Sequence, residues 1–265
     1  MRNLLYAIIA SLATSLFFCL NCSADEPDEL LHTQCLYPTI HVSQINKEGY
    51  GSGFIVRSSK ISKDRYLNVF LTAAHVASSY DHKVKVFEYE DWSLIKRTHT
   101  YPATIYAADN TRDIAIGMFI SDEKMPVTKI DMDSKLYIGS QVFHVGCGLG
   151  EDPRLDYGKI TSLRSKIGGA GDWMLRTSVF SIPGDSGGAL FNSKYRAIGM
   201  LKSIRHLRTG QLIFNMSYYT PLTCLRDWSE EESGAYDFVW KERAFPRMPF
   251  WELHFSYDYL ITKVP

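Results

Sequence analysis

The sequence predicts an all-β protein built from two antiparallel six-stranded β-barrels. Short apolar or β-branched segments bounded by turn residues recur along the chain in two groups of about six. A polar segment at 121–139, which contains Pro126 and several charges, separates the two groups. Neither group is interrupted by an amphipathic helical pattern, which argues against alternating strands and helices. Two such groups joined by a linker are typical of two packed barrels.

The positions of the strands follow from these segments. In the first barrel, over about 36–120, we expect strands at 40–45, 51–57, 66–72, 83–90, 99–107 and 113–119. In the second barrel, over about 140–222, we expect strands at 141–147, 157–165, 173–180, 187–193, 195–204 and 212–220. Both barrels belong to one expected domain over 25–222. An apolar content of 45% is sufficient to form the buried cores of such a domain.

The final segment, 223–265, is rich in aromatic residues mixed with charges and is short for a second domain. We expect an extension that packs its aromatic side chains on the outside of the second barrel. The alternative is a surface for a partner, a membrane or a substrate.

The first residues have the character of a targeting signal. Arg2 precedes a 17-residue apolar segment, Leu4–Leu20, and small residues follow at Cys22-Ser23-Ala24. This pattern predicts a signal peptide over 1–24 and a secreted or periplasmic protein, with no stable membrane insertion after cleavage. The alternatives are an uncleaved membrane anchor and a lipoprotein modified on Cys19 or Cys22.

Charge and cysteine content restrict the classes of partner and cofactor. Lys plus Arg equals Asp plus Glu at 29 each, so no net positive field favours nucleic acid. Signal cleavage would leave Cys35, Cys147 and Cys224, which allow one disulfide; a Cys35–Cys224 pair would tie the two ends of the domain together, and the pairing stays open. Because these three cysteines form no CxxC spacing and no His/Cys cluster, we expect no structural metal, and we expect no cofactor.

The segment 183–190, with the sequence PGDSGGAL, is the most specific motif in the chain. A nucleophilic serine must be exposed on a tight turn, with backbone N–H groups directed at the developing oxyanion. Glycines on both sides of Ser186 permit such a turn, and the N–H groups of Gly184 and Ser186 would form the oxyanion hole. The alternative is an ordinary hairpin turn.

A histidine and an aspartate upstream complete a candidate triad. His75 follows the apolar strand and small residues of FLTAAH, the setting in which a general base is held rigidly yet remains open to solvent. Asp113 immediately precedes the apolar segment IAIGM, where a buried carboxylate could orient the imidazole. Asp109 is the rival, but its surroundings are typical of a solvated turn.

The serine motif also satisfies the G-x-S-x-G elbow of α/β-hydrolases, so the order of the residues is needed to separate two folds. The elbow requires its acid and its histidine after the serine, with the serine between a strand and a helix. Here Ser186 is followed by a strand-like segment, and both convincing partners lie upstream. An esterase of the elbow type is therefore the weaker alternative.

With TAAHV around His75, RDIAI around Asp113 and PGDSGGAL around Ser186, the chain resembles the trypsin-like (chymotrypsin-fold) serine peptidases, and most closely their bacterial HtrA-like branch. The segments GSGFIV from Gly51 and IGSQV from Ile138 are similar to further blocks of that branch, so the resemblance covers about 38–222. It implies a serine endopeptidase acting on proteins or peptides through an acyl-enzyme. We expect no PDZ domain after residue 222.

Two further expectations depend on the resemblance. Asp185 stands where zymogen-activated relatives have an acid that pairs with a newly cut N-terminal amine, but no such activation sequence is visible, and its partner stays open. By the family's spacing, the base of the first specificity pocket is Phe180, with walls around Lys202–Ile204, including Ser203, and 214–218. An aromatic base predicts small or medium apolar residues before the cut. A non-enzymatic alternative is a binding protein that keeps the triad but uses its surface for partners.

Overall fold

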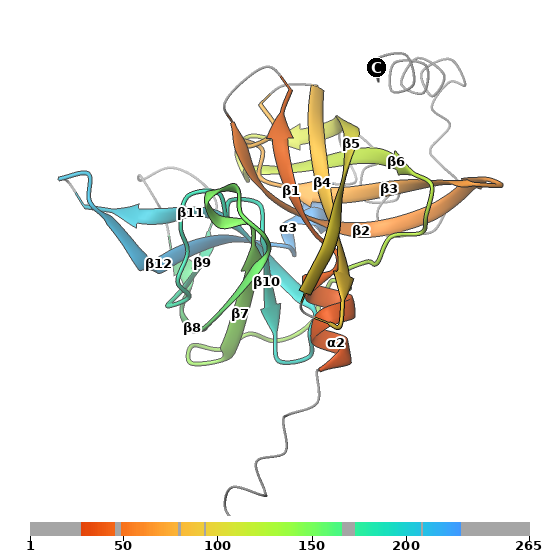
Figure 1. Ribbon diagram of the computed structural model, residues 1–265. Helices are drawn as coiled ribbons and strands as arrows, with labels where there is room; N and C mark the ends of the chain where they lie inside the picture. Colours follow the sequence, from red (N-terminus) through yellow and green to blue (C-terminus); the bar gives the residue numbers. More distant parts are fainter. Residues whose placement is uncertain are drawn as a thin grey trace, which may run out of the picture.

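Two closed antiparallel β-barrels form the body of the protein (Figure 1). The computed structural model describes residues 28–45, 49–78, 81–92, 94–165, 173–207 and 209–228. The expected signal peptide and nearly all of the C-terminal extension lie outside these residues. The predicted fold class is confirmed.

Each barrel contains six strands. The first, in the spatial order β1-β2-β3-β6-β5-β4, consists of β1 (Thr39–Gln44), β2 (Tyr50–Ser62), β3 (Arg65–Thr72), β4 (Asp81–Glu90), β5 (Leu94–Asp109) and β6 (Ile114–Ser121). The second, in the order β10-β11-β12-β9-β8-β7, consists of β7 (Gln141–Gly146), β8 (Arg154–Ser165), β9 (Met174–Thr177), β10 (Ala189–Asn192), β11 (Ala197–His206) and β12 (Leu212–Pro221). The helical elements are short: α2 (Glu29–Leu31), η1 (His32–Leu36), η2 (Gly148–Gly150) and α3 (Cys224–Trp228).

Two predicted strands around the serine motif are shorter than expected. The expected strand at 173–180 ends at Thr177, because Ser178 and Ser181 donate their amides to Lys159 and Phe214 outside the regular ladder. The expected strand at 187–193 begins at Ala189, because Gly187 adopts a φ of +90° that a strand does not tolerate. The second difference follows from the turn that carries the serine.

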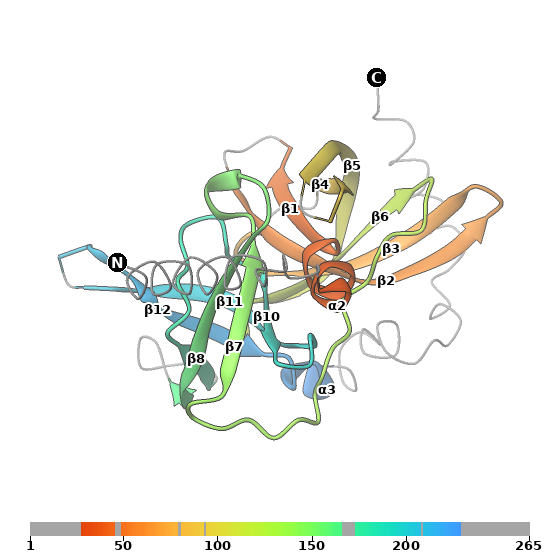
Figure 2. The same ribbon diagram turned by 60° about the horizontal axis from the view of Figure 1, so that its bottom comes forward.

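A large hydrophobic cluster joins the interior of the first barrel to one side of the second barrel, whose own interior forms a second, smaller cluster. Side chains of the second barrel, among them Phe143, Phe191 and Met200, belong to the same buried cluster as the interior of the first. The segment of α2 and η1 lies at the junction (Figure 2), where the Cys35 thiol contacts the Tyr195 carbonyl oxygen. The linker adds a bridge between Ile130 and Ala197. The barrels are therefore fixed to one another by packing.

The disulfide considered between Cys35 and Cys224 is not formed, because Cys35 is a buried free thiol. Cys147 is likewise buried and free. Over the described ranges, we find no helix with both the length and the apolar character to cross a membrane.

A close pair in the first barrel gives a test of this packing. Gly117 lies opposite Phe70 in the β3–β6 ladder, and a Cβ added to Gly117 would lie 2.1 Å from the Phe70 Cζ atom. We expect Gly117→Ala to lower the free energy of unfolding by about 1–3 kcal/mol, because the ring must leave its position. Denaturant unfolding measures this loss. In the double variant G117A/F70L the loss should be smaller than the sum of the two single losses; additive losses would contradict the contact.

Candidate active site

The structure brings His75 and Asp113 into direct contact. His75 follows the end of β3 and Asp113 immediately precedes β6, and these strand ends are neighbours because Thr72 pairs with Ala115. The Asp113 Oδ2 atom lies 2.8 Å from His75 Nδ1, and Oδ1 accepts the His75 backbone N–H at 2.9 Å. The Asp113 side chain is 9% exposed, whereas that of His75 is 49% exposed. A buried carboxylate thus holds an imidazole that is open to solvent.

This contact also sets the tautomer of the imidazole. An ionised carboxylate can only accept hydrogen bonds, so His75 must donate from Nδ1, and Nε2 of the neutral ring is left as the acceptor. Asp113 adopts a φ of +60°, an uncommon value for a residue with a side chain. Such backbone strain is found where the surrounding structure fixes a functional side chain.

The rival carboxylate, Asp109, stabilises the turn that leads to Asp113. Its Oδ1 accepts the amides of Thr111 and Arg112 at 2.8 and 3.0 Å, and its Oδ2 accepts Arg112 Nη1 at 2.6 Å. Burial raises the pKa of Asp109, but these hydrogen bonds and the charge of Arg112 hold that pKa below its ordinary value. Asp109 therefore has its own structural partners and, among the described residues, makes no hydrogen bond or ion pair with His75.

The serine motif forms a tight loop, residues 182–188, which we call the serine loop. The Asp185 amide donates to the Ile182 carbonyl at 3.1 Å, and the Asp185 carbonyl accepts the Gly188 amide at 2.9 Å. Gly184 and Gly187 have φ values of +98° and +90°, which glycine adopts without strain. The expected turn is therefore present, and β10 follows it, so the strand–turn–helix of the α/β-hydrolase elbow is contradicted.

Two amides of the serine loop have the properties expected of an oxyanion hole. The Pro183 carbonyl accepts the Leu149 amide at 2.7 Å, and because a trans peptide directs its N–H away from its C=O, the Gly184 N–H points away from Leu149. Within the described part of the chain, neither the Gly184 nor the Ser186 amide donates to a protein acceptor. These donors are thus available to a ligand.

The serine loop packs against the strand ends of the first barrel. A Cβ added to Gly187 would lie 2.1 Å from the Ser52 carbonyl oxygen and 2.9 Å from the Ala73 amide nitrogen. A Cβ added to Gly51 would lie 2.5 Å from the Val76 side chain and 2.7 Å from the Ser186 carbonyl oxygen. The structure therefore places the serine loop beside the segment 73–76 that carries His75.

Comparisons with known proteins identify the family of this chain. A family model for the trypsin-like peptidase domain matches residues 51–200. This chain belongs to the trypsin-like peptidase family. The serine protease HhoA of Synechocystis sp. is 28% identical over 168 residues, and a DegP-like periplasmic serine endoprotease of Pseudomonas putida (strain GB-1) is 27% identical over 190 residues. The resemblance to the HtrA-like branch is thereby confirmed.

The extent of these matches is limited. The two alignments cover 61% and 71% of this chain but only 39% and 36% of the relatives, so the chain spans well under half of their length. Among solved structures, Deg5 aligns with a TM-score of 0.57 and 18% identity over 75% of this chain and 89% of that chain. The serine endoprotease from Yersinia pestis aligns with a TM-score of 0.55 and 19% identity over 77% of this chain and 66% of that chain. These structural matches support the fold of this trypsin-like peptidase.

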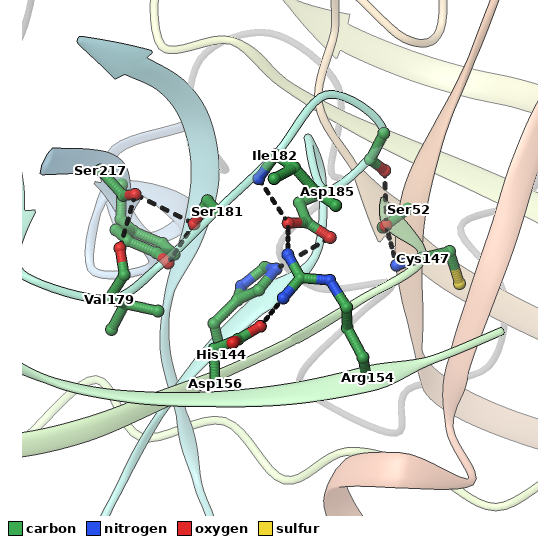
Figure 3. A network of polar contacts seen from close by, with 12 residues as sticks. Ser52, His144, Cys147, Arg154, Asp156, Val179, Ser181, Ile182, Asp185 and Ser217 are labelled. Atoms are coloured by element: carbon green, nitrogen blue, oxygen red, sulfur yellow. Dashed lines mark hydrogen bonds and ion pairs between the residues drawn. The ribbon is translucent and has the colours of Figure 1, made fainter. Parts of the chain in front are cut away.

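The partner of Asp185, which the sequence left open, is Arg154 of β8 (Figure 3). The Asp185 Oδ2 atom accepts the Arg154 guanidinium and also the Ile182 amide, the latter at 2.9 Å. The fully buried His144 imidazole lies nearby, with Nε2 at 3.8 Å from Asp185 Oδ1. The acid beside the serine is thus paired with a side chain of the same barrel.

The residues expected to form the specificity pocket lie in different environments. Phe180 is 44% exposed, because the alternating extended segment buries Val179 and Ser181 and turns Phe180 outward. Its ring contacts that of Phe214, at a centroid distance of 5.7 Å. The Lys202 ammonium group donates to the Thr111 carbonyl at 3.2 Å and so turns toward the first barrel. A pocket built on Phe180 stays a prediction.

Sequence reasoning missed the roles of several polar residues. Behind Phe180, the buried Ser217 hydroxyl contacts the Val179 carbonyl at 2.9 Å and the Ser181 hydroxyl at 3.0 Å (Figure 3). The Ser203 hydroxyl, expected in the pocket wall, is buried with no hydrogen-bond partner in the described residues.

The hydroxyl of Ser52 bonds both the Gly184 carbonyl and the Cys147 amide. A small residue between two glycines was the only signal for Ser52. Among the described residues, no group of His, Cys, Asp or Glu side chains is arranged to hold a metal ion.

The close approach of the serine loop to β2 can be tested with a matched pair of glycines. Gly187 and Gly210 have similar φ values, +90° and +84°, but a Cβ on Gly210 would meet nothing within 4 Å. Gly210→Ala should cost only the backbone strain of about 1–2 kcal/mol. Gly187→Ala should lower the free energy of unfolding by about 1–3 kcal/mol more, because its Cβ overlaps Ser52. Equal losses in thermal or denaturant unfolding would contradict this packing.

Proposed function

We propose that this trypsin-like peptidase is a serine endopeptidase in which His75, Asp113 and Ser186 form the catalytic triad. The observation that carries the proposal is the buried Asp113 carboxylate, which holds both the ring and the backbone N–H of His75. The serine loop beside the His75 segment, with two amides that have no protein acceptor in the described residues, supports the same function.

The proposed mechanism is two-step acyl transfer. His75 Nε2 removes the Ser186 proton, the hydroxyl oxygen attacks the scissile carbonyl carbon, and the Gly184 and Ser186 amides bind the resulting oxyanion. Asp113 stabilises the imidazolium, which then protonates the leaving amine. Water, deprotonated by His75, attacks the acyl-enzyme and releases the acid product together with free Ser186. The reaction needs no cofactor.

We propose proteins or peptides as substrates and a periplasmic or secreted location. The location is supported by the apolar N-terminal segment and by the periplasmic relatives of the DegP-like group. A binding protein without proteolytic activity would share the fold, and covalent labelling separates the two. A fluorophosphonate that labels the wild type and not Ser186→Ala supports the enzyme, whereas an unreactive wild type would contradict it.

Substitutions in the triad should have larger effects than a matched substitution outside it. We expect Ser186→Ala, His75→Ala and Asp113→Asn each to lower kcat by about 10⁴-fold, because each removes a member of one catalytic unit. Asp109→Asn is the matched control. It alters a partly buried carboxylate of the turn that leads to Asp113, and its kcat should stay within about tenfold of wild type. Hydrolysis of casein-derived peptides measures kcat, and a loss in D109N as large as in D113N would contradict the assignment.

The aromatic Phe180 predicts the preferred residue before the cut. We expect small or medium apolar residues there, because the exposed ring leaves a shallow apolar surface and the Arg154 guanidinium lies over it, 5.3 Å from its centroid. Digestion of a proteome followed by mass spectrometry measures the preference. Phe180→Ala should widen it toward larger apolar residues. A strong preference of the wild type for Arg, Lys or Glu would contradict the pocket.

A further inference from the structure

We propose that Arg154 is a positioning residue of the active site. Through its ion pair with Asp185 it holds the serine loop in the conformation that leaves the Gly184 and Ser186 amides available to an oxyanion. This inference rests on the proposed function, because it assigns a role in the same reaction. It concerns how the site is assembled rather than which residues react.

The Asp185 carboxylate needs a cation where it lies. Its side chain is completely buried, and an ionised carboxylate without a partner is strongly destabilising there. Burial raises the pKa of Asp185, but the neighbouring His144 imidazole, the Ile182 amide and the Arg154 guanidinium together hold that pKa below its ordinary value. Of these neighbours, Arg154 supplies the permanent charge.

Asp185 is also the residue on which the serine loop closes. Within the loop, the Asp185 amide donates to the Ile182 carbonyl and the Asp185 carbonyl accepts the Gly188 amide. The Asp185 carboxylate in addition accepts the Ile182 amide. Gly184 and Ser186 are its immediate neighbours in the chain. A movement of the Asp185 side chain therefore moves both of the amides assigned to the oxyanion hole.

Arg154 is fixed from three sides, as a positioning residue requires. Its guanidinium contacts the carboxylates of Asp156 and Asp185 (Figure 3). Its Cζ atom lies over the Phe180 ring, 5.3 Å from the centroid. The backbone of Arg154 is paired with Gly146 in the β7–β8 ladder, and β7 pairs in turn with β10. The cation thus belongs to the same sheet as the strand that follows the serine loop.

The source of the cation has a functional consequence. Where the corresponding acid pairs with a newly cut N-terminal amine, the serine loop is completed by cleavage. Here the partner is a side chain of β8, so the ion pair forms when the second barrel folds. We therefore expect the serine loop to be organised without a cut.

The test compares Arg154→Gln, Arg154→Lys and the control Arg164→Gln, which alters a second arginine of β8 that packs over Trp173. We expect R154Q to lower kcat and the rate of fluorophosphonate labelling by at least about 100-fold, the size of losing an oxyanion donor, with KM within a few fold. R154K keeps the charge and should retain kcat within about tenfold of wild type. R164Q should behave as wild type.

A double variant separates the charge from packing. R154Q/D185N leaves no uncompensated buried charge, so its kcat should exceed that of R154Q by about tenfold or more. Circular dichroism and thermal unfolding establish that each variant is folded. If R154Q does not fold, R154Q/D185N replaces it in the comparison with wild type. A lower kcat with an unchanged KM in that double variant then supports the inference.

The outcomes distinguish this inference from the proposed function. The role of Arg154 would be overturned if R154Q, or R154Q/D185N in its place, folded and kept the wild-type kcat and labelling rate. That result would leave the endopeptidase function intact. A wild-type protein that neither hydrolyses peptides nor reacts at Ser186 would overturn the proposed function itself. Loss of kcat in R164Q equal to that in R154Q would also overturn the inference, because the effect would not be specific to the serine loop.

Discussion

The arrangement of the candidate site depends on one buried residue, Ser52 of β2, at which the two barrels meet. Its amide donates to the Ser186 carbonyl at 2.7 Å, and its carbonyl accepts the Thr72 hydroxyl at 2.7 Å. Its hydroxyl donates to the Gly184 carbonyl at 2.8 Å and accepts the Cys147 amide at 2.7 Å. Ser52 thus bonds Thr72, at the end of the strand that precedes His75, and it also bonds Gly184 and Ser186 of the serine loop. Because every polar group of Ser52 is used, a shift of one barrel against the other would leave buried groups unsatisfied.

Two buried carboxylates perform different tasks because they face different partners. Asp113 faces an imidazole that is open to solvent, so it can orient a group that gains and loses a proton. Asp185 faces a guanidinium that keeps its charge at any working pH, so its effect is on the shape of the loop. In the proposed mechanism, the same side-chain chemistry therefore serves proton transfer in one barrel and loop geometry in the other. The proposed active site needs both at once, because its proposed base, His75, and its proposed oxyanion donors come from different barrels.

The sequence was sufficient to predict the strands and the two barrels, since strand periodicity and turn residues are local signals. It also singled out His75 and Asp113, which the structure brings together, because each lies next to a recognisable apolar strand. Arg154 could not be predicted in the same way. It lies 31 residues before Asp185 in the chain, and only the pairing of β8 with β7, and of β7 with β10, brings the two side chains together. The outward turn of Phe180 likewise depends on where β9 ends, a boundary that local sequence defines poorly.

The most direct measurement is a crystal structure of the protein after reaction with a phosphonate inhibitor. We expect a covalent bond to Ser186 Oγ, with one phosphonyl oxygen accepting both the Gly184 and the Ser186 amides and with Asp185 still paired to Arg154. His75 should lie between the adduct and Asp113. An adduct on another residue would contradict Ser186 as the nucleophile. A Pro183–Gly184 peptide turned so that its carbonyl faces the phosphonyl oxygen would contradict the proposed oxyanion hole.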